Sequence, residues 1–315
     1  MSQKNPWRRI AVTAAAMLIV LLAIASYRFA ASRGVFASVA DKAPAICRNV
    51  AGIPDVAAMA TSPAGVFVAA RDGGLYLYAH SALTRLAGTP KDFHPVALAA
   101  SGPGLQAVFS RADGSYAIAV FGLDGTKLSE IGRLTTDILT DPAAIASLDG
   151  SRFYLVNRHT SRSTFGRWLD DTFLIPRANV LYFDGMKFVP VAERLSGPSG
   201  IALSADGAHL YVAQGLARNI VGFERNPFMG SLDHAQLMNL SDAPGAMTAA
   251  KDGSLIVAAW QKPGTGAVYR VRLANGVMLS AELLYASARD TVTAAAEADG
   301  HLLIGSPSKL LDCAL

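Results

Sequence analysis

A short unit that recurs along the chain constrains the fold more than any other feature of this sequence. Between residues 198 and 224 it consists of an alternating apolar strand, a Ser-Ala-Asp-Gly turn ending at Gly207, a second apolar strand, a looser connection and a third strand. Apolar residues that alternate with small or polar ones are typical of half-buried strands. An Asp-Gly pair favours a tight hairpin because glycine adopts positive φ without steric cost.

The turn glycine of this unit occurs six times, and a short apolar strand follows each occurrence. Successive turn glycines are separated by 39, 46, 57, 46 and 47 residues, at Gly65, Gly104, Gly150, Gly207, Gly253 and Gly300. Six repeats at this spacing predict an all-β fold, a six-bladed β-propeller with four short strands in each blade. The alternative is a β-sandwich in which the Asp-Gly turns recur by coincidence.

An apolar segment precedes the repeats. Residues 10–27 form an uncharged run of 18 residues, close to the ~20 that cross a bilayer as a helix. Lys4, Arg8 and Arg9 precede this run without any acidic residue, which favours a cytoplasmic N-terminus. The alternative is a cleaved signal peptide, because Ala23-Ile24-Ala25 is a small-x-small pattern. The predicted organisation is a cytoplasmic N-terminus (1–9), a transmembrane signal anchor (10–27), a linker (28–44) and the propeller (45–315).

The net charge of +4 comes from this N-terminal part. Residues 1–33 contain five basic residues and no acidic one, so the remainder of the chain is close to neutral. A basic surface for nucleic acid is therefore not expected.

The only two cysteines stand at opposite ends of the repeat region. Cys47 lies at its start and Cys313 is the third residue from the end. The first and last strands of a propeller must meet, so a disulfide between these residues would close the ring in an oxidising compartment. The alternative is two buried free thiols.

The longest interval between turn glycines contains an insertion. Residues 160–172 mix charged and aromatic side chains, including Phe165 and Trp168. Long loops often carry function, so this loop is a candidate lid over the tunnel or a surface for a protein partner. The alternative is a solvated connection whose aromatic side chains pack on the neighbouring blade.

The repeat region opens with Cys-Arg-Asn-Val-Ala-Gly-Ile at residues 47–53 and closes with Lys-Leu-Leu-Asp-Cys-Ala-Leu at residues 309–315. These segments resemble the two ends of the serum paraoxonase/arylesterase family of six-bladed propellers, and the resemblance runs from Cys47 to Leu315. The resemblance implies a disulfide between Cys47 and Cys313. The regucalcin/gluconolactonase and strictosidine synthase groups share the strand and turn pattern more distantly.

The resemblance also implies hydrolysis of lactones and aryl esters with a calcium ion in the central tunnel. Calcium prefers six to eight oxygen ligands and polarises the ester carbonyl. Most of the family's ligand positions are changed in this sequence. The positions that retain an oxygen donor are Asn157 and Ser199, with Asp55 as a third candidate if the alignment gap lies elsewhere. Calcium is thus an expected cofactor only in a depleted site.

Three further residues are candidates for binding and catalysis. Arg158 stands where the family has an aspartate, and a guanidinium cannot ligate a metal. It would hold an anionic substrate or the carboxylates of Asp55 and Asp242, or else pair with Asp141. His159 follows it as a second candidate substrate-binding residue. His94 aligns with a histidine proposed as a general base in the family.

Three hypotheses about function follow from these residues. The first is an exported, membrane-anchored hydrolase of small esters or lactones, with His94 as its base. The second is a non-catalytic propeller that binds a ligand or a protein through the tunnel mouth and the 160–172 loop. The third is a metal-free activity like that of strictosidine synthase. A nucleophilic serine hydrolase is not expected, because no Gly-x-Ser-x-Gly motif occurs.

Overall fold

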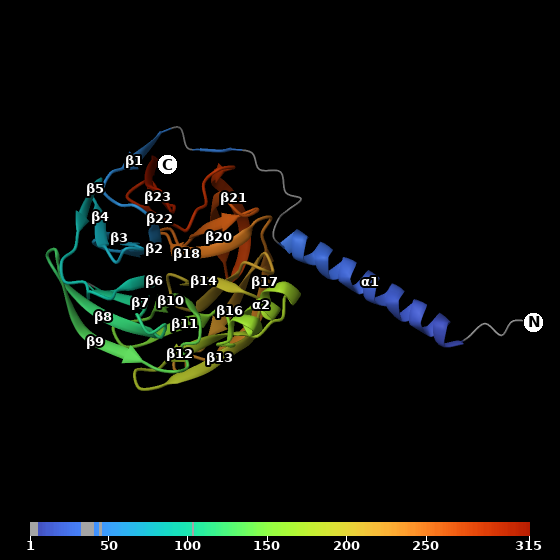
Figure 1. Ribbon diagram of the computed structural model, residues 1–315. Helices are drawn as coiled ribbons and strands as arrows, with labels where there is room; N and C mark the ends of the chain where they lie inside the picture. The colour runs from blue at the N-terminus through green and yellow to red at the C-terminus, as the bar shows by residue number, and fades with distance from the viewer. Residues whose placement is uncertain (1–5, 33–40, 44–45, 103) are drawn as a thin grey trace, which may run out of the picture.

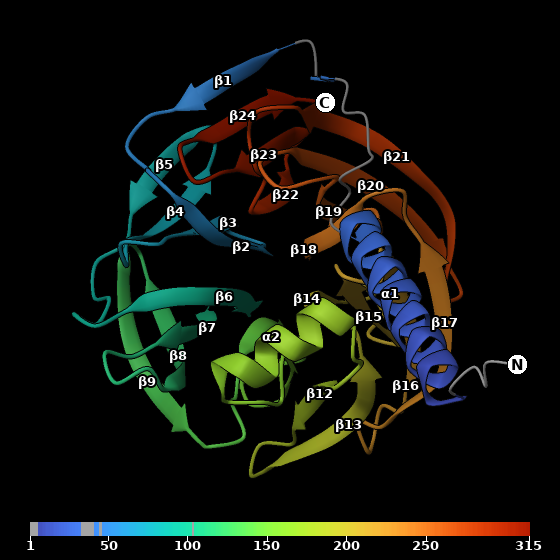
Figure 2. The same ribbon diagram turned by 45° about the vertical axis from the view of Figure 1, so that its right-hand side comes forward.

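The computed structural model describes residues 6–32, 41–43, 46–102 and 104–315. Within these residues the strands form six four-stranded antiparallel sheets around a central axis, which confirms the predicted six-bladed propeller (Figures 1 and 2). The first three sheets are β2 (Val56–Ser62), β3 (Gly65–Ala70), β4 (Leu75–Ala79) and β5 (Ala82–Arg85); β6 (His94–Ser101), β7 (Gly104–Ser110), β8 (Tyr116–Asp124) and β9 (Lys127–Thr135); β10 (Pro142–Ser147), β11 (Phe153–Asn157), β12 (Ala178–Phe183) and β13 (Phe188–Leu195).

The remaining sheets continue the ring. They are β14 (Pro198–Leu203), β15 (His209–Gln214), β16 (Asn219–Arg225) and β17 (Leu232–Asn239); β18 (Ala243–Ala249), β19 (Leu255–Trp260), β20 (Gly266–Ala274) and β21 (Val277–Ser287); β22 (Ala294–Ala298), β23 (His301–Gly305) and β24 (Leu310–Ala314), with β1 (Cys47–Val50) as the fourth strand.

The turn glycines behave differently from blade to blade. Gly207, Gly253 and Gly300 have positive φ, as their Asp-Gly pairs predict, and so does Gly65, which follows an alanine. Gly150 does not, although it also follows an aspartate; the Asp149 carboxylate accepts hydrogen bonds from the backbone N–H groups of Ser151 and Arg152. The repeat was therefore located correctly, although not every turn uses glycine in the same conformation.

The apolar cores lie between adjacent sheets. The described residues form six buried clusters, each with side chains from two neighbouring blades, such as Phe67 of β3 with Phe109 of β7 and Tyr154 of β11 with Leu210 of β15. No blade buries both of its faces alone, so the blades are stable only as a closed ring.

The two ends of the chain close this ring. β1 pairs with β24, and Cys47 and Cys313 are joined by a disulfide across that pair. Beside it the buried Asp312 carboxylate accepts hydrogen bonds from Arg48 Nε at 2.7 Å and from the Tyr78 hydroxyl at 2.5 Å. The disulfide is thus formed as predicted, within a polar cluster that also connects to the first blade.

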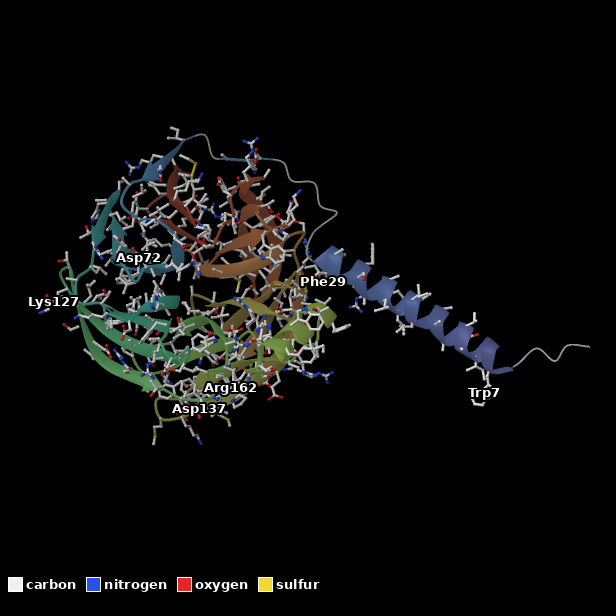
Figure 3. All side chains as sticks on the ribbon, viewed as in Figure 1. Trp7, Phe29, Asp72, Lys127, Asp137 and Arg162 are labelled. Atoms are coloured by element: carbon white, nitrogen blue, oxygen red, sulfur yellow. A yellow bond between two sulfur atoms is a disulfide. The ribbon has the colours of Figure 1, made fainter. Side chains whose placement is uncertain are left out.

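Helix α1 (Pro6–Ser32) extends away from the propeller, with Phe29 near the propeller and Trp7 at the far end (Figure 3). Residues Ile10–Ala31 are long and apolar enough to cross a membrane. The helix continues through residues 28–32, which the sequence had assigned to the linker. No glycine or proline interrupts the chain between Trp7 and Arg33, so nothing ends the helix at Tyr27.

Candidate functional site

A cavity of about 390 Å³ lies at the end of the tunnel where the innermost strands of the blades begin. We call it the mouth cavity. It is lined by residues at or just before the start of the innermost strand of each blade (β2, β6, β10, β14, β18 and β22, here called the inner strands). It is also lined by residues at the far end of the second strands, including Arg71 and Arg158 just after β3 and β11 and Trp260 at the end of β19. A volume of this size falls within the range of small-molecule sites.

β-Bulges shape the rim of the mouth cavity. Five of the six inner strands shift register against their second strands at this end, between Val56 and Ala58, Pro95 and Ala97, Pro142 and Ala144, Pro198 and Gly200, and Pro244 and Met247. A bulge leaves its extra residue out of the ladder. The bulged residues that line the cavity are Ala57, Val96, Ala143, Ser199, Gly245 and Ala246.

Sequence reasoning missed these bulges, although the sequence contains a signal for them. Proline recurs at Pro95, Pro142, Pro198 and Pro244, one residue before the bulged position of each strand. Because proline cannot donate to the ladder, it is confined to edges and bulges of sheets. A recurring proline followed by small residues therefore marks the tunnel end of each inner strand.

Gly200 is required by the close approach of two inner strands at this rim. A Cβ atom there would lie 2.1 Å from the carbonyl oxygen of Gly245. We expect Gly200→Ala to cost about 1–3 kcal/mol of unfolding free energy, because backbone atoms must shift to accept it. Gly132→Ala is the matched control, since nothing lies within 4 Å of its Cβ position. Urea unfolding of both variants checks this, and equal stabilities would contradict it.

The candidate calcium ligands do not form a ligand set. Asn157 is buried outside the mouth cavity, where its Oδ1 accepts hydrogen bonds from the backbone N–H groups of Thr140 and Asp141. Ser199 lines the cavity, but its hydroxyl donates to the Pro244 carbonyl at 2.8 Å. Asp55 does not line the cavity and pairs with Arg71 at 3.1 Å.

The acidic side chains that the structure describes near the mouth cavity also do not form a metal-binding set. Within the described residues, no group of three or more His, Cys, Asp or Glu side chains is arranged to hold a metal ion. Among the described residues Asp141 is the only carboxylate that lines the mouth cavity, and calcium prefers several oxygen ligands with net negative charge. The side chains at the mouth therefore do not fit a calcium ion.

His159 lies beside the cavity, between two carboxylates. Its Nδ1 is 2.6 Å from Asp141 Oδ2 and its Nε2 is 2.9 Å from Asp171 Oδ1, while its side chain is only 7% exposed. Burial alone would lower the pKa of His159, but the hydrogen bonds to Asp141 and Asp171 outweigh it and raise that pKa to about 9. The imidazole is thus a buried cation whose ring nitrogens are both occupied.

The His159 cation also affects Asp141. Burial acts to raise the pKa of Asp141, but the hydrogen bond from His159 and the charges of Arg158 and Arg167 outweigh it, so the pKa is lowered. Both partners are therefore charged at neutral pH. Their role is to fix the segment after β11, and neither ring nitrogen of His159 remains free for a substrate.

The 160–172 insertion contains helix α2 (Thr164–Phe173), which sequence reasoning did not predict. Ser163 is its N-cap and accepts a hydrogen bond from the Gly166 N–H. Asp171 joins the helix to His159, and Arg162 pairs with Asp137, near which it lies in Figure 3. The missed signal is a serine N-cap before apolar residues at helical spacing.

The aromatic side chains of α2 do not pack on a neighbouring blade. Phe165, Trp168 and Phe173 are 68%, 54% and 53% exposed. Their rings contact one another instead, with centroids 5.8 Å apart for Phe165 and Trp168 and 6.4 Å for Trp168 and Phe173. Of the two interpretations of the loop, the packed connection is wrong for these rings, and a protein partner at this surface stays a prediction.

Arg158 is the first residue after β11 and lines the mouth cavity. Its side chain makes no hydrogen bond or ion pair with any residue that the structure describes. The carboxylates suggested for it from sequence are occupied elsewhere, because Asp55 pairs with Arg71 and Asp242 accepts a hydrogen bond from Tyr269 at 2.8 Å. Asp141, the third carboxylate suggested from sequence, forms no ion pair with Arg158, although the charge of Arg158 acts on it. Arg158 therefore brings to the cavity a positive charge that Asp141 shares with His159 and Arg167.

His94 begins β6 and is exposed, one residue before Pro95 at the cavity rim. It does not line the mouth cavity, and its imidazole has no hydrogen-bond partner among the described residues. The structure thus brings Arg158 and Ser199 to the same cavity and places His94 beside it. Asn157, His159 and Asp55 lie outside the cavity.

Curated proteins with similar sequences are serum paraoxonases. The chain is 27% identical to mouse serum paraoxonase/arylesterase 1 over 121 residues, which is 38% of this chain and 34% of that protein. It is 28% identical to dog serum paraoxonase/arylesterase 2 over 109 residues, 35% of this chain and 31% of that protein. The match spans about a third of the length of these relatives.

Solved structures with the same fold have very different sequences. A gluconolactonase from Xanthomonas campestris superposes with a TM-score of 0.58 at 15% identity, covering 89% of this chain and 99% of that one. An aldose sugar dehydrogenase with bound PQQ from Streptomyces coelicolor superposes with a TM-score of 0.55 at 14% identity, covering 87% and 99%. At this identity the likeness shows the fold alone.

The family model described as Arylesterase matches residues 105–315, about two thirds of the chain. This range includes four of the six turn glycines and the second cysteine, and it leaves out β1, the first blade and β6. The chain therefore belongs to the arylesterase family.

Proposed function

We propose that this protein is an exported, membrane-anchored propeller that binds a small organic molecule in the mouth cavity. The observation that carries the proposal is the cavity itself, whose 390 Å³ combine the unpaired Arg158 with the aromatic side chains of Tyr116 and Trp260. A concave site with a few convergent polar groups is the usual form of a small-molecule site. The side chains at the mouth lack the carboxylates of a metal centre, which supports binding over metal-assisted hydrolysis.

The anchoring part of the proposal is supported by α1 and by the disulfide. The 22 residues of Ile10–Ala31 would extend about 33 Å as a helix, enough for the ~30 Å hydrocarbon core of a bilayer. Disulfides such as Cys47–Cys313 persist in oxidising compartments. With basic residues before the span, the propeller would lie on the extracytoplasmic side of the membrane.

Binding is tested on the full chain in detergent with a panel of aryl acetates, lactones and the acids that they release. A ligand at about 100 times its Kd is expected to raise Tm by about 5 °C. Ala143→Trp fills the rim of the mouth cavity and should abolish the shift, whereas Ala112→Trp, at an exposed site outside it, should not. No shift with any compound, or the same shift in Ala143→Trp, would contradict the proposal.

A second candidate function is hydrolysis of an ester or lactone, favoured by family membership and by the free imidazole of His94. There His94 would take a proton from the attacking water, and Arg158 would face the negative charge that develops on the carbonyl oxygen. Turnover of phenyl acetate and of a γ-lactone, with and without calcium, tests this. His94→Gln should lower kcat about 10²–10⁴-fold if His94 is the base. Absence of turnover by a folded protein leaves binding as the function.

A further inference from the structure

The charged side chains that line the mouth cavity include one more cation than anions. Two arginines and one aspartate line it, namely Arg71, Arg158 and Asp141. Arg71 is paired with Asp55 at 3.1 Å, so this pair contributes no net charge. The remaining question is whether Asp141 offsets the charge of Arg158.

Asp141 is shared among several cations. Its Oδ2 is bound to the buried imidazole of His159, and its Oδ1 lies 3.9 Å from Arg167 Nη1. Asp171 binds the other ring nitrogen of His159. The positive charge of Arg158 also acts on Asp141. The cluster therefore holds three cations (Arg158, His159 and Arg167) and two carboxylates (Asp141 and Asp171), so one positive charge is in excess, and Arg158 is the cation of this cluster that lines the cavity.

The backbone holds Arg158 in place while its side chain stays available. Its N–H donates to the Asp141 carbonyl at 2.8 Å, and the preceding Asn157 is fixed by hydrogen bonds from two backbone N–H groups. A guanidinium presents up to five donors in a rigid fork that matches the two oxygens of a carboxylate. The cavity thus contains a fixed point of attachment for one anionic group.

We propose that the mouth cavity selects monocarboxylates, with the carboxylate paired to Arg158 and the apolar part of the molecule against Trp260 and Met247. This inference rests on the proposed function and narrows its ligand class. A single spare charge favours a monoanion, and a planar fork favours a carboxylate. Neutral esters and lactones lack this charge, whereas the acids formed by their hydrolysis carry it. The site therefore favours the acid form of such molecules over the ester.

The test compares two probes of similar size, benzoate and methyl benzoate, by titration calorimetry on the full chain in detergent at pH 7. Benzoate is expected to bind at least about tenfold more tightly, the effect of a charge-assisted hydrogen bond. Arg158→Met should remove this preference, and Arg158→Lys should retain part of it. The affinity for benzoate should also fall with added salt, unlike that for methyl benzoate.

Arg111→Met is the matched control. Arg111 follows β7 directly, as Arg158 follows β11, but it lies outside the mouth cavity and pairs with Asp113 at 3.4 Å. This variant should leave the preference for benzoate unchanged. Melting curves establish that each variant is folded, which the exposure of Arg158 leads us to expect.

Each outcome decides the proposal. Equal affinities for the two probes, or a preference for benzoate that persists in Arg158→Met, would overturn it while the proposed small-molecule site stands. If neither probe binds but a neutral lactone of the panel raises Tm, the inference fails and the proposed function survives. If no compound of either kind binds, both are overturned.

Discussion

Replacing Cys47 and Cys313 together with serine is expected to lower the free energy of unfolding by about 5 kcal/mol. The disulfide spans 266 residues, and in the chain-entropy model a loop of this length contributes about that much by restricting the unfolded chain. The closing strand pair β1–β24 and the Asp312 cluster remain in the variant, so it should still fold. Urea unfolding with and without the substitutions measures the difference.

Reduction provides the control for this prediction. Dithiothreitol should lower the stability of the unsubstituted protein to that of the double variant, and it should leave the variant unchanged. A loss below about 1 kcal/mol would show that the hydrogen bonds around Asp312 close the ring without the disulfide.

Replacing His159 with glutamine is expected to cost about 3 kcal/mol at pH 6. The raised pKa of His159, about 9 against an ordinary 6.5, corresponds to that order of free energy. The substitution also leaves the Asp141 and Asp171 carboxylates without the cation between them, and carboxylates that lose a buried partner are costly. α2 should then be held less firmly over the third blade.

The pH dependence distinguishes this charge effect from simple loss of packing. Because the pKa of His159 is higher in the folded protein, its contribution is fully present below pH 6.5 and is lost as the pH rises through about 9. Unfolding by urea at several pH values should show the difference between the protein and His159→Gln shrinking over that range. His94→Gln, at an exposed histidine, is the control and should change stability by less than about 0.5 kcal/mol. A difference independent of pH would contradict the charge effect.

The blades and their closure were predictable because they depend on local pattern and on the order of the chain. Alternating apolar residues and a recurring turn fix the strands, and a ring requires its first and last strands to meet. The places of Cys47 and Cys313 at these two strands then made the disulfide predictable. Residue type and spacing also indicated the apolar span, although its helix extends to Ser32.

The candidate site was less predictable because a side chain's role depends on its three-dimensional neighbours. Asn157 and His159 are adjacent to Arg158 in sequence, yet their polar atoms face the protein interior, while the guanidinium of Arg158 reaches the cavity. The pairing of His159 with Asp171 depends on α2, which brings a residue from the insertion back onto the third blade.

The sequence alone determined the number of blades and their closure by Cys47 and Cys313, because the order of the repeats along the chain is the order of the blades around the ring. It also determined the likeness to arylesterases, which rests on matching residues at the two ends of the repeat region. Only the tertiary structure decided which charges at the mouth cavity cancel. Charges interact across space, and the cations around Asp141 come from two separate segments, the residues after β11 and helix α2. The excess of one positive charge in this cluster is what makes Arg158 available to an anionic ligand.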